Sequence, residues 1–291
     1  MVLDSESGEV VFQGRSGAAN WSQTPPDIFD EHCREALDGC PHVDAVCGCL
    51  SGLLGTKARQ EAAYYLAHLT KAPAIAYADY AAAFAASPEG TDLLVIAGTG
   101  TLVCSPSQDG GWVKTSGGGP LLGGDPGAVF TICRKTMADL FLTGESEETQ
   151  PLWNLMEEVW GVREVDDLVG AFYKDPNRSY HACRLIGLIL EQWRSHGRPV
   201  SDIPGESLLE LASLIFHHLG STGVTDDPVQ VCLAGGLWSV DPELPEWFIA
   251  LLNDNSEPGF FTGVLPEREA VWGACQLARR VLSSSHPLST P

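Results

Sequence analysis

Two patterns of apolar residues alternate along the chain. Short apolar runs predict strands within the segments 9–17, 43–53, 72–78, 93–98, 111–118, 229–239 and 259–264. Apolar residues spaced three or four positions apart predict helices over residues 25–40, 57–70, 79–87, 129–142, 244–254 and 267–282, with a helical region over 151–220. Strands that alternate with helices in this way are typical of an α/β fold.

The predicted elements fall into two groups, before and after about residue 90. We therefore expect a smaller N-terminal domain over residues 1–90 and a larger C-terminal domain over residues 91–282, with a cleft between them. Residues 283–291 read SSSHPLSTP and are expected to form a disordered tail.

Glycines interrupt two of the apolar runs. After the strand at 93–97 the chain reads Gly98, Thr99, Gly100, Thr101, and a second strand ends in Gly235 and Gly236. Glycine allows a sharp turn and a close backbone approach, and outward-facing backbone N–H groups suit an anion such as phosphate. An ordinary β-turn is the alternative interpretation of the first turn.

Two aspartates stand where the pattern changes. Asp79 lies where a predicted strand ends and a helix begins, which is where α/β folds place ligand-binding groups. Its carboxylate could act as a general base, or it could cap the helix. Asp125 lies inside a glycine-rich loop at 117–128, an unusual composition for a purely structural turn.

Charge restricts the partners. The formal net charge is −21 at pH 7, which argues against binding to nucleic acid or to an anionic membrane surface. Long-range attraction would not bring a phosphate to this chain, so binding one requires local backbone amides and a metal ion. No apolar stretch of membrane-spanning length appears, and we expect a cytoplasmic protein.

The cysteine and histidine patterns do not predict a metal site. The nine cysteines are scattered and form no C-x-x-C pair, although Cys47 and Cys49 form a C-x-C. Free buried thiols are the interpretation we favour. His217 and His218 lie on a predicted amphipathic helix with no acidic or cysteine partner at ligand spacing.

Six segments, taken in order, resemble one family. They are GRSGAANW (14–21), YADYAAAFA (77–85), IAGTGT (96–101), SGGGPLLGGDPGA (116–128), LAGGLW (233–238) and AVWGACQLA (270–278). Together they resemble N-acetylglucosamine kinases of the BadF/BadG/BcrA/BcrD ATPase family, within the actin-like and hexokinase-like ATPases. The resemblance implies a two-domain, ribonuclease H-like α/β fold with an interdomain cleft.

The resemblance also implies an activity, which is transfer of the γ-phosphoryl group of ATP, with Mg²⁺, to the 6-hydroxyl of an amino sugar. It assigns the catalytic role to Asp79, phosphate binding to Gly98, Thr99, Gly100 and Thr101, sugar binding to Asn20, Gly118, Gly119 and Asp125, and adenosine binding to Gly235 and Gly236. No residue is assigned as a metal ligand. A homodimer is consistent with the resemblance and rests on nothing else.

The sequence departs from the family pattern in two places. The family's first strand and first phosphate loop are missing, so MVLDSESGEVV corresponds to the end of the second strand, a turn and the third strand. Either the start Met was assigned too late or the chain is a degenerate member. The family's Asp-Glu-Gly-Ser is replaced by Asp125–Ala128, which puts the sugar-binding role of Asp125 in doubt.

These departures keep two alternatives to an active kinase open. One is a catalytically inactive pseudokinase that binds sugar or nucleotide and has a regulatory role. The other is a dehydratase-activating ATPase, as in other branches of the family, for which only Cys47 and Cys49 could be cluster ligands.

Overall fold

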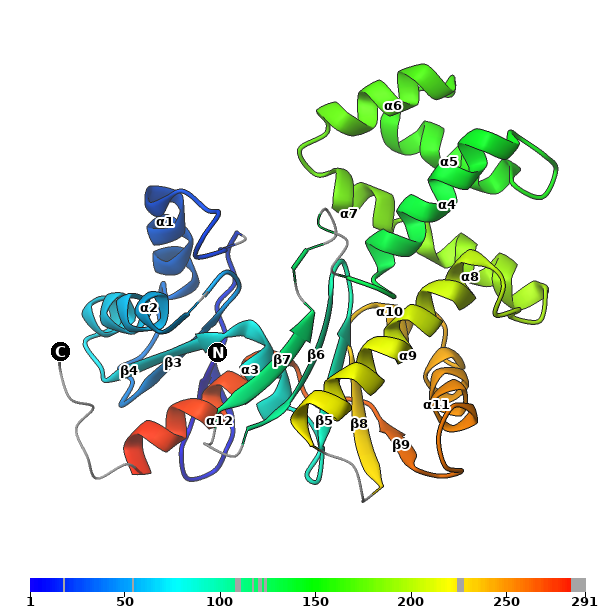
Figure 1. Cartoon of the computed structure of the whole chain (residues 1–291). Coiled ribbons are helices and arrows are strands. Elements are labelled where there is room, and N and C mark those ends of the chain that lie inside the picture. Colours follow the sequence, from blue (N-terminus) through cyan, green and yellow to red (C-terminus); the bar gives the residue numbers. More distant parts are fainter. Residues whose placement is uncertain are drawn as a thin grey trace. The chain divides into compact units, whose positions relative to one another are not determined.

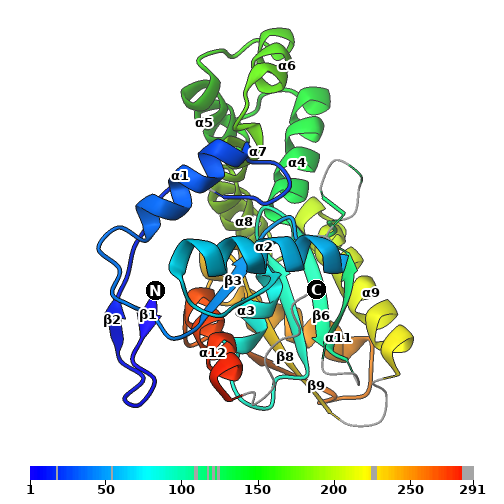
Figure 2. The ribbon, with the colours of Figure 1, turned by 90° about the vertical axis from the view of Figure 1, so that its left-hand side faces the viewer.

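The computed structural model describes residues 1–17, 19–53, 55–107, 111–116, 118–119, 122, 125–223 and 228–283. Its chain divides into two compact units. Unit 1 comprises Met1–Glu89 and the residues from Pro266 on, and unit 2 comprises Gly90–Leu265. Figure 1 labels most elements of both units, and Figure 2 labels the first two strands as well. The predicted tail lies, from residue 284 on, outside the described residues.

Unit 1 contains two small sheets. Strands β1 (Val2–Leu3) and β2 (Val10–Phe12) pair antiparallel, joined by a turn at residues 4–9, as the resemblance implied. Strands β3 (Val46–Leu50) and β4 (Ala74–Ala78) pair parallel. Among the described residues each sheet has two strands.

Four helices are described in unit 1. They are α1 (Pro26–Ala36), α2 (Gly55–Thr70), α3 (Asp79–Ala85) and α12 (Ala270–Ser283). Of these, α2, α3 and α12 pack against the β3–β4 pair (Figure 2). Pro26 occupies the first turn of α1, where its missing N–H costs nothing. Strand β4 changes directly into α3 at Asp79, and this confirms the change of pattern predicted there.

The last helix packs against α3. A β-carbon on Gly273 would overlap the carbonyl oxygen of Ala82, so glycine allows the two helix backbones to approach closely. Helix α12 is thus part of unit 1, whereas the sequence pattern placed residues 267–282 with the larger domain. A local pattern of apolar residues predicts that a helix forms. It does not predict which unit that helix packs against.

Unit 2 is built on a mixed five-stranded sheet, in the order β7-β6-β5-β8-β9. Its strands are β5 (Leu93–Ala97), β6 (Thr101–Pro106), β7 (Trp112–Ser116), β8 (Val229–Ala234) and β9 (Phe261–Val264). The first three form an antiparallel meander, and β8 and β9 run parallel to β5.

Eight helices are described in unit 2. They are α4 (Val129–Thr143), α5 (Gln150–Trp160), α6 (Val165–Lys174), α7 (Arg178–Cys183), α8 (Ile186–Ser195), α9 (Ile203–Thr222), α10 (Leu237–Val240) and α11 (Leu244–Asp254). The core joins Leu93 and Val95 of β5 to apolar residues of α4 and α9, including Phe130 and Leu211. Burial of these side chains is the main source of the stability of unit 2.

His218 is part of this core. It is fully buried on α9, its Nε2 lies 2.9 Å from Ser105 Oγ on β6, and its Nδ1 lies 2.8 Å from Thr115 Oγ1 on β7. Burial lowers the pKa of His218, with a smaller contribution from His217. The residue ties a helix to two strands, as expected of a structural histidine.

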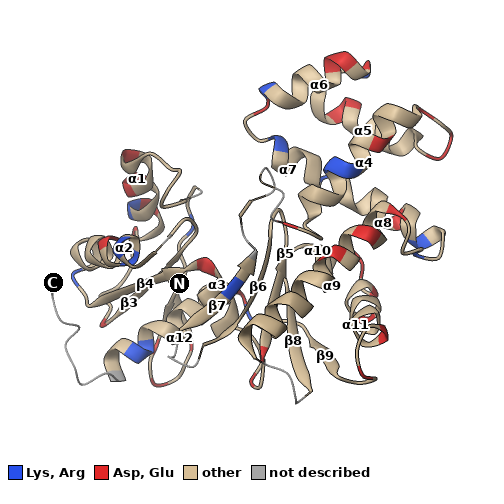
Figure 3. Cartoon of the chain, in the orientation of Figure 1, with Lys and Arg blue, Asp and Glu red and all other residues tan. Residues whose placement is uncertain are grey.

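All nine cysteines are free, as predicted, but only Cys104, Cys133 and Cys232 are buried and the other six are half-buried. The Sγ atoms of Cys47 and Cys49 lie 3.6 Å apart on one face of β3, and this contact, followed by burial, raises the pKa of Cys47. Acidic side chains lie on the helices of both units, and Lys and Arg are sparse (Figure 3). In the part of the chain that the structure describes, no helix is both long and apolar enough to cross a bilayer.

Candidate functional site

Two glycine turns lie side by side in unit 2. Strands β5 and β8 are parallel neighbours, with Ile96 opposite Ala234, so the turns that follow them emerge at the same edge of the sheet. These are the predicted phosphate turn, Gly98–Thr101, and the predicted adenosine turn, Gly235–Gly236. The carboxyl edge of parallel strands is where open α/β sheets bind ligands.

The two turns are in direct contact. Gly235 has a φ of +103°, and a β-carbon there would overlap the carbonyl oxygen of Ala97. A β-carbon on Gly98 would lie 4.0 Å from the backbone nitrogen of Gly236. Glycine is therefore required at Gly235 on both conformational and steric grounds.

The first turn adjoins the start of α4. Gly98 N–H donates to the Gly100 carbonyl at 2.9 Å, and Val129 N–H, the first of α4, donates to the Gly98 carbonyl at 2.8 Å. Helix α4 has no side-chain cap and no acidic residue in its first turn. The positive end of a helix dipole thus lies next to the turn, an arrangement that favours an anion.

Asp125 lies against this turn. Its side chain is 3% exposed, and a β-carbon on Gly100 would lie 2.8 Å from its Oδ2 atom. The hydroxyl of Thr131 on α4 donates to its backbone carbonyl at 2.9 Å. Within unit 2 the structure therefore brings Asp125 together with the predicted phosphate-binding residues.

The two threonines of the turn differ. Thr101 is 3% exposed, and its Oγ1 has no hydrogen-bond partner among the described residues. Thr99 is exposed, and its hydroxyl interacts with the thiol of Cys183 at the end of α7. Burial raises the pKa of Cys183 to about 11, and the hydrogen bond with Thr99 opposes this shift. Helix α7 thus reaches the phosphate turn.

In unit 1, polar residues gather where β3 and β4 end. Leu50 pairs with Ala78, so Ser51 and Asp79 follow at neighbouring positions of one edge. Asn20 forms an isolated bridge with Ser51 and donates from Nδ2 to Ser51 Oγ at 3.3 Å. The sequence analysis did not name Ser51 as a site residue. Its position directly after a predicted strand could have indicated it, because α/β folds place ligand-binding groups there.

The side chain of Asn20 organises this loop. Its Oδ1 accepts hydrogen bonds from the backbone N–H and the hydroxyl of Ser22, each at 3.0 Å. A β-carbon on Gly52 would overlap the same oxygen. Asn20 Nδ2 carries two protons and donates one of them to Ser51, so the other can donate to a ligand.

Asp79 is exposed at the first position of α3, and its Oδ1 accepts a hydrogen bond from Tyr80 N–H at 3.0 Å. The second carboxylate oxygen can accept a proton or a hydrogen bond from a ligand. The N-cap of α3 is Ala78, so Asp79 does not cap the helix in the predicted way, and its carboxylate is open to solvent.

Gly118 and Gly119 follow β7. Gly119 has a φ of +87°, and its carbonyl accepts a hydrogen bond from Leu122 N–H at 3.3 Å. Residues 117, 120, 121, 123 and 124 of this glycine-rich loop lie outside the described residues.

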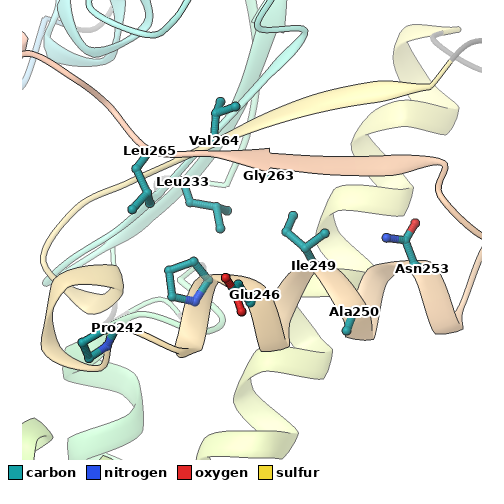
Figure 4. Close-up of a pocket in the computed structure, with 10 residues that line it drawn as sticks. Leu233, Pro242, Glu246, Ile249, Ala250, Asn253, Gly263, Val264 and Leu265 are labelled. Atoms are coloured by element: carbon teal, nitrogen blue, oxygen red, sulfur yellow. The ribbon is translucent and has the colours of Figure 1, made fainter.

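A cavity of about 480 Å³ lies between α11 and β9 (Figure 4). Apolar side chains, among them Pro245, Ile249 and Val264, dominate its lining. A β-carbon on Gly263 would lie 2.6 Å from Cγ1 of Ile249, so this glycine brings the strand close to the helix. Leu233, two residues before Gly235, also lines the cavity.

Solved structures share this fold. A candidate N-acetylglucosamine kinase from Chromobacterium violaceum is similar with a TM-score of 0.66 and 18% identity, over 94% of this chain and 92% of that one. A candidate N-acetylglucosamine kinase from Porphyromonas gingivalis has a TM-score of 0.66 and 17% identity, over 90% and 89%. Two α/β units with a mixed sheet in unit 2 thus define an actin-like, hexokinase-like ATPase fold.

A glucokinase of the ROK family from Streptomyces griseus, solved with glucose and AMPPNP, is also similar. Its TM-score is 0.51 at 15% identity, over 88% of this chain and 90% of that one. No protein-family model matches the sequence. No curated protein matches it either. At these identities the likeness establishes the fold and leaves the chemistry to the residues themselves.

Proposed function

We propose that the chain is an ATP-dependent sugar kinase that phosphorylates the 6-hydroxyl of an amino sugar, N-acetylglucosamine being the first choice. The observation that carries the proposal is the pair of contacting glycine turns, Gly98–Thr101 and Gly235–Gly236, at the start of α4. The names of two fold neighbours support the choice of sugar.

The glycine turns fit a nucleotide. Glycine at positions 98 and 235 lets the two turns lie against each other, and the start of α4 favours negative charge. In this proposal the amides of the first turn after Gly98, whose own N–H donates to Gly100, bind the phosphates. Thr99 lies beside them, and Gly236 packs against the adenosine. Mg-ATP supplies the phosphoryl group and a cation that neutralises its charge.

Asp79 is the general base of the proposed reaction. Its exposed carboxylate lies at the carboxyl end of β4, where it can orient a sugar hydroxyl and accept its proton. Phosphoryl transfer needs little covalent participation from the protein, so orientation of the hydroxyl and removal of its proton are the main tasks.

Asn20 and Ser51 are the sugar-side groups of unit 1. The remaining amide proton of Asn20 and the hydroxyl of Ser51 suit the hydroxyl and acetamido groups of an amino sugar. Gly118 and Gly119 stay sugar-binding candidates from the sequence, since small residues would allow a sugar ring to come close to the backbone.

Release of ADP in the presence of ATP, MgCl₂ and N-acetylglucosamine, glucosamine or glucose tests the proposal. We expect sugar-dependent release that Asp79→Asn lowers by about 10²–10⁴-fold, with sugar affinity unchanged within a few-fold, because the base acts mainly in the transition state. Asp38→Asn, a change at an exposed aspartate beyond the end of α1, is the matched control.

Equal turnover in the Asp79→Asn variant would remove Asp79 from the mechanism. Thermal stabilisation by sugar without any release of ADP would instead identify a pseudokinase, since ligand binding stabilises a protein whether or not chemistry follows.

A further inference from the structure

We propose that the carboxylate of Asp125 binds the divalent cation that accompanies ATP, and that Asp125 acts with the phosphates rather than with the sugar. This inference rests on the proposed function and deepens it. The sequence pattern assigned Asp125 to the sugar, and no residue of the chain to the metal.

The position of Asp125 is the first argument. Its Oδ2 is so close to Gly100 that a β-carbon there would lie 2.8 Å away, which places the carboxylate at the backbone of the phosphate turn. The hydroxyl of Thr131 on α4 donates a hydrogen bond to the backbone carbonyl of Asp125 at 2.9 Å, which holds Asp125 next to the start of α4. Asp125 is only 3% exposed, so its carboxylate is held inside unit 2.

Charge is the second argument. A buried carboxylate and a triphosphate repel each other strongly when they share one turn, and the repulsion grows where water is excluded. The chain also carries a net charge of −21. A divalent cation that contacts both groups converts this repulsion into attraction, which explains why an aspartate is compatible with a phosphate turn.

The ligand chemistry is the third argument. Magnesium prefers oxygen ligands and is commonly held by one or two carboxylates together with substrate phosphates and water. Among the described residues there is no group of three or more His, Cys, Asp or Glu that could hold a metal by itself. The cation is therefore expected to bind together with the nucleotide and only weakly to the protein alone.

Thr101 supplies an independent observation. Its hydroxyl is buried and has no hydrogen-bond partner among the described residues. Alternate residues of a strand share a face, so Thr101 points to the same side as Ser105, which contacts His218 of α9. An unsatisfied buried hydroxyl directly after Gly100 is costly, and a water or a polar group of a ligand would satisfy it.

Calorimetric titration with ATP tests the inference, once in MgCl₂ and once in EDTA. For the wild-type protein we expect magnesium to lower the Kd of ATP by about tenfold or more. In Asp125→Asn this ratio should fall close to one. Metal-free ATP should bind the variant more tightly than it binds wild type, because a negative charge beside the phosphates is gone.

Asp139→Asn is the matched control, since Asp139 is an exposed aspartate on the same helix α4. It should keep the wild-type ratio. A purely structural role for Asp125 would lower the affinity for ATP equally with and without magnesium, so that result would overturn the inference. An unchanged ratio in Asp125→Asn would overturn it too, while ATP binding by wild type would leave the proposed function standing.

A measurement on the unaltered protein covers the case in which Asp125→Asn does not fold. Crystals grown with AMPPNP and Mn²⁺ should show anomalous scattering from Mn²⁺ at direct ligand distance from the Asp125 carboxylate. A manganese peak on the phosphates alone would overturn the inference and keep the kinase proposal. Failure of wild type to bind ATP under either condition would overturn both.

Discussion

The carbonyl oxygen of Ala97 occupies the space that a β-carbon on Gly235 would need. Ala97 ends β5 and Gly235 follows β8, so this contact joins the two glycine turns at the carboxyl edge of the sheet. Gly235 also has a φ of +103°, which side chains other than glycine rarely adopt. The two turns can therefore lie this close only because Gly235 has a hydrogen atom in place of a side chain.

Substitution Gly235→Ala should separate the two turns. We expect a loss of at least about 2 kcal/mol in the free energy of unfolding, because steric overlap adds to backbone strain. ATP affinity should fall as well. Urea unfolding measures the first effect, and Gly236→Ala is the control for the free energy of unfolding alone, since a β-carbon there meets nothing within 4 Å.

Substitution Gly273→Ala should displace α12 from α3. The added carbon would overlap the Ala82 carbonyl oxygen and lie 2.7 Å from the backbone nitrogen of Ala86, so we expect a loss of about 1–3 kcal/mol. Gly187→Ala on α8 meets nothing within 4 Å and should be neutral or stabilise by up to about 1 kcal/mol. If Gly273→Ala and Gly187→Ala changed the thermal unfolding temperature equally, the close contact between α12 and α3 would be contradicted.

Substitution His218→Ala should cost about 2–4 kcal/mol, because it opens a cavity and leaves the buried Ser105 hydroxyl without its partner. His217 is the neighbouring residue but is exposed, so His217→Ala should change the free energy of unfolding by less than about 0.5 kcal/mol. Chemical unfolding at pH 8 compares the two variants.

The lowered pKa of His218 also predicts a pH dependence. Below about pH 6.5, the ordinary histidine value, the unfolded chain takes up a proton that the folded protein excludes until its own lower pKa is reached. The contribution of neutral His218 to the free energy of unfolding is therefore complete above about pH 6.5. It is lost as the pH falls from there to the lower pKa of the folded protein. Unfolding curves from pH 8 to pH 5 should show the loss in wild type and in His217→Ala, but not in His218→Ala.

The sequence predicted the features that depend on local pattern. The change from strand to helix at Asp79 is visible because apolar alternation gives way to an alanine-rich helical run. The two glycine turns were visible because each interrupts an apolar run, whereas their contact became known only from the pairing of β5 with β8. The fold class followed from the order of six segments and was confirmed by the solved structures.

Features that depend on distant residues were not predictable in this way. The helical period of α9 suggests that His218 is buried, but its partners Ser105 and Thr115 lie more than a hundred residues away. Asp125 lies against Gly100 because of the conformation of a loop, and the spacing of apolar residues does not predict loop conformation. The return of α12 to unit 1 is likewise a property of packing between the two ends of the chain.

The most direct test of the central claim is to identify the product by ³¹P NMR and mass spectrometry after incubation with ATP, MgCl₂ and N-acetylglucosamine. The account predicts a new sugar phosphate with the phosphoryl group on the 6-hydroxyl, formed by wild type and by Asp38→Asn and almost absent with Asp79→Asn. If wild type binds both ATP and sugar but forms inorganic phosphate alone or no product, the chain is not a sugar kinase.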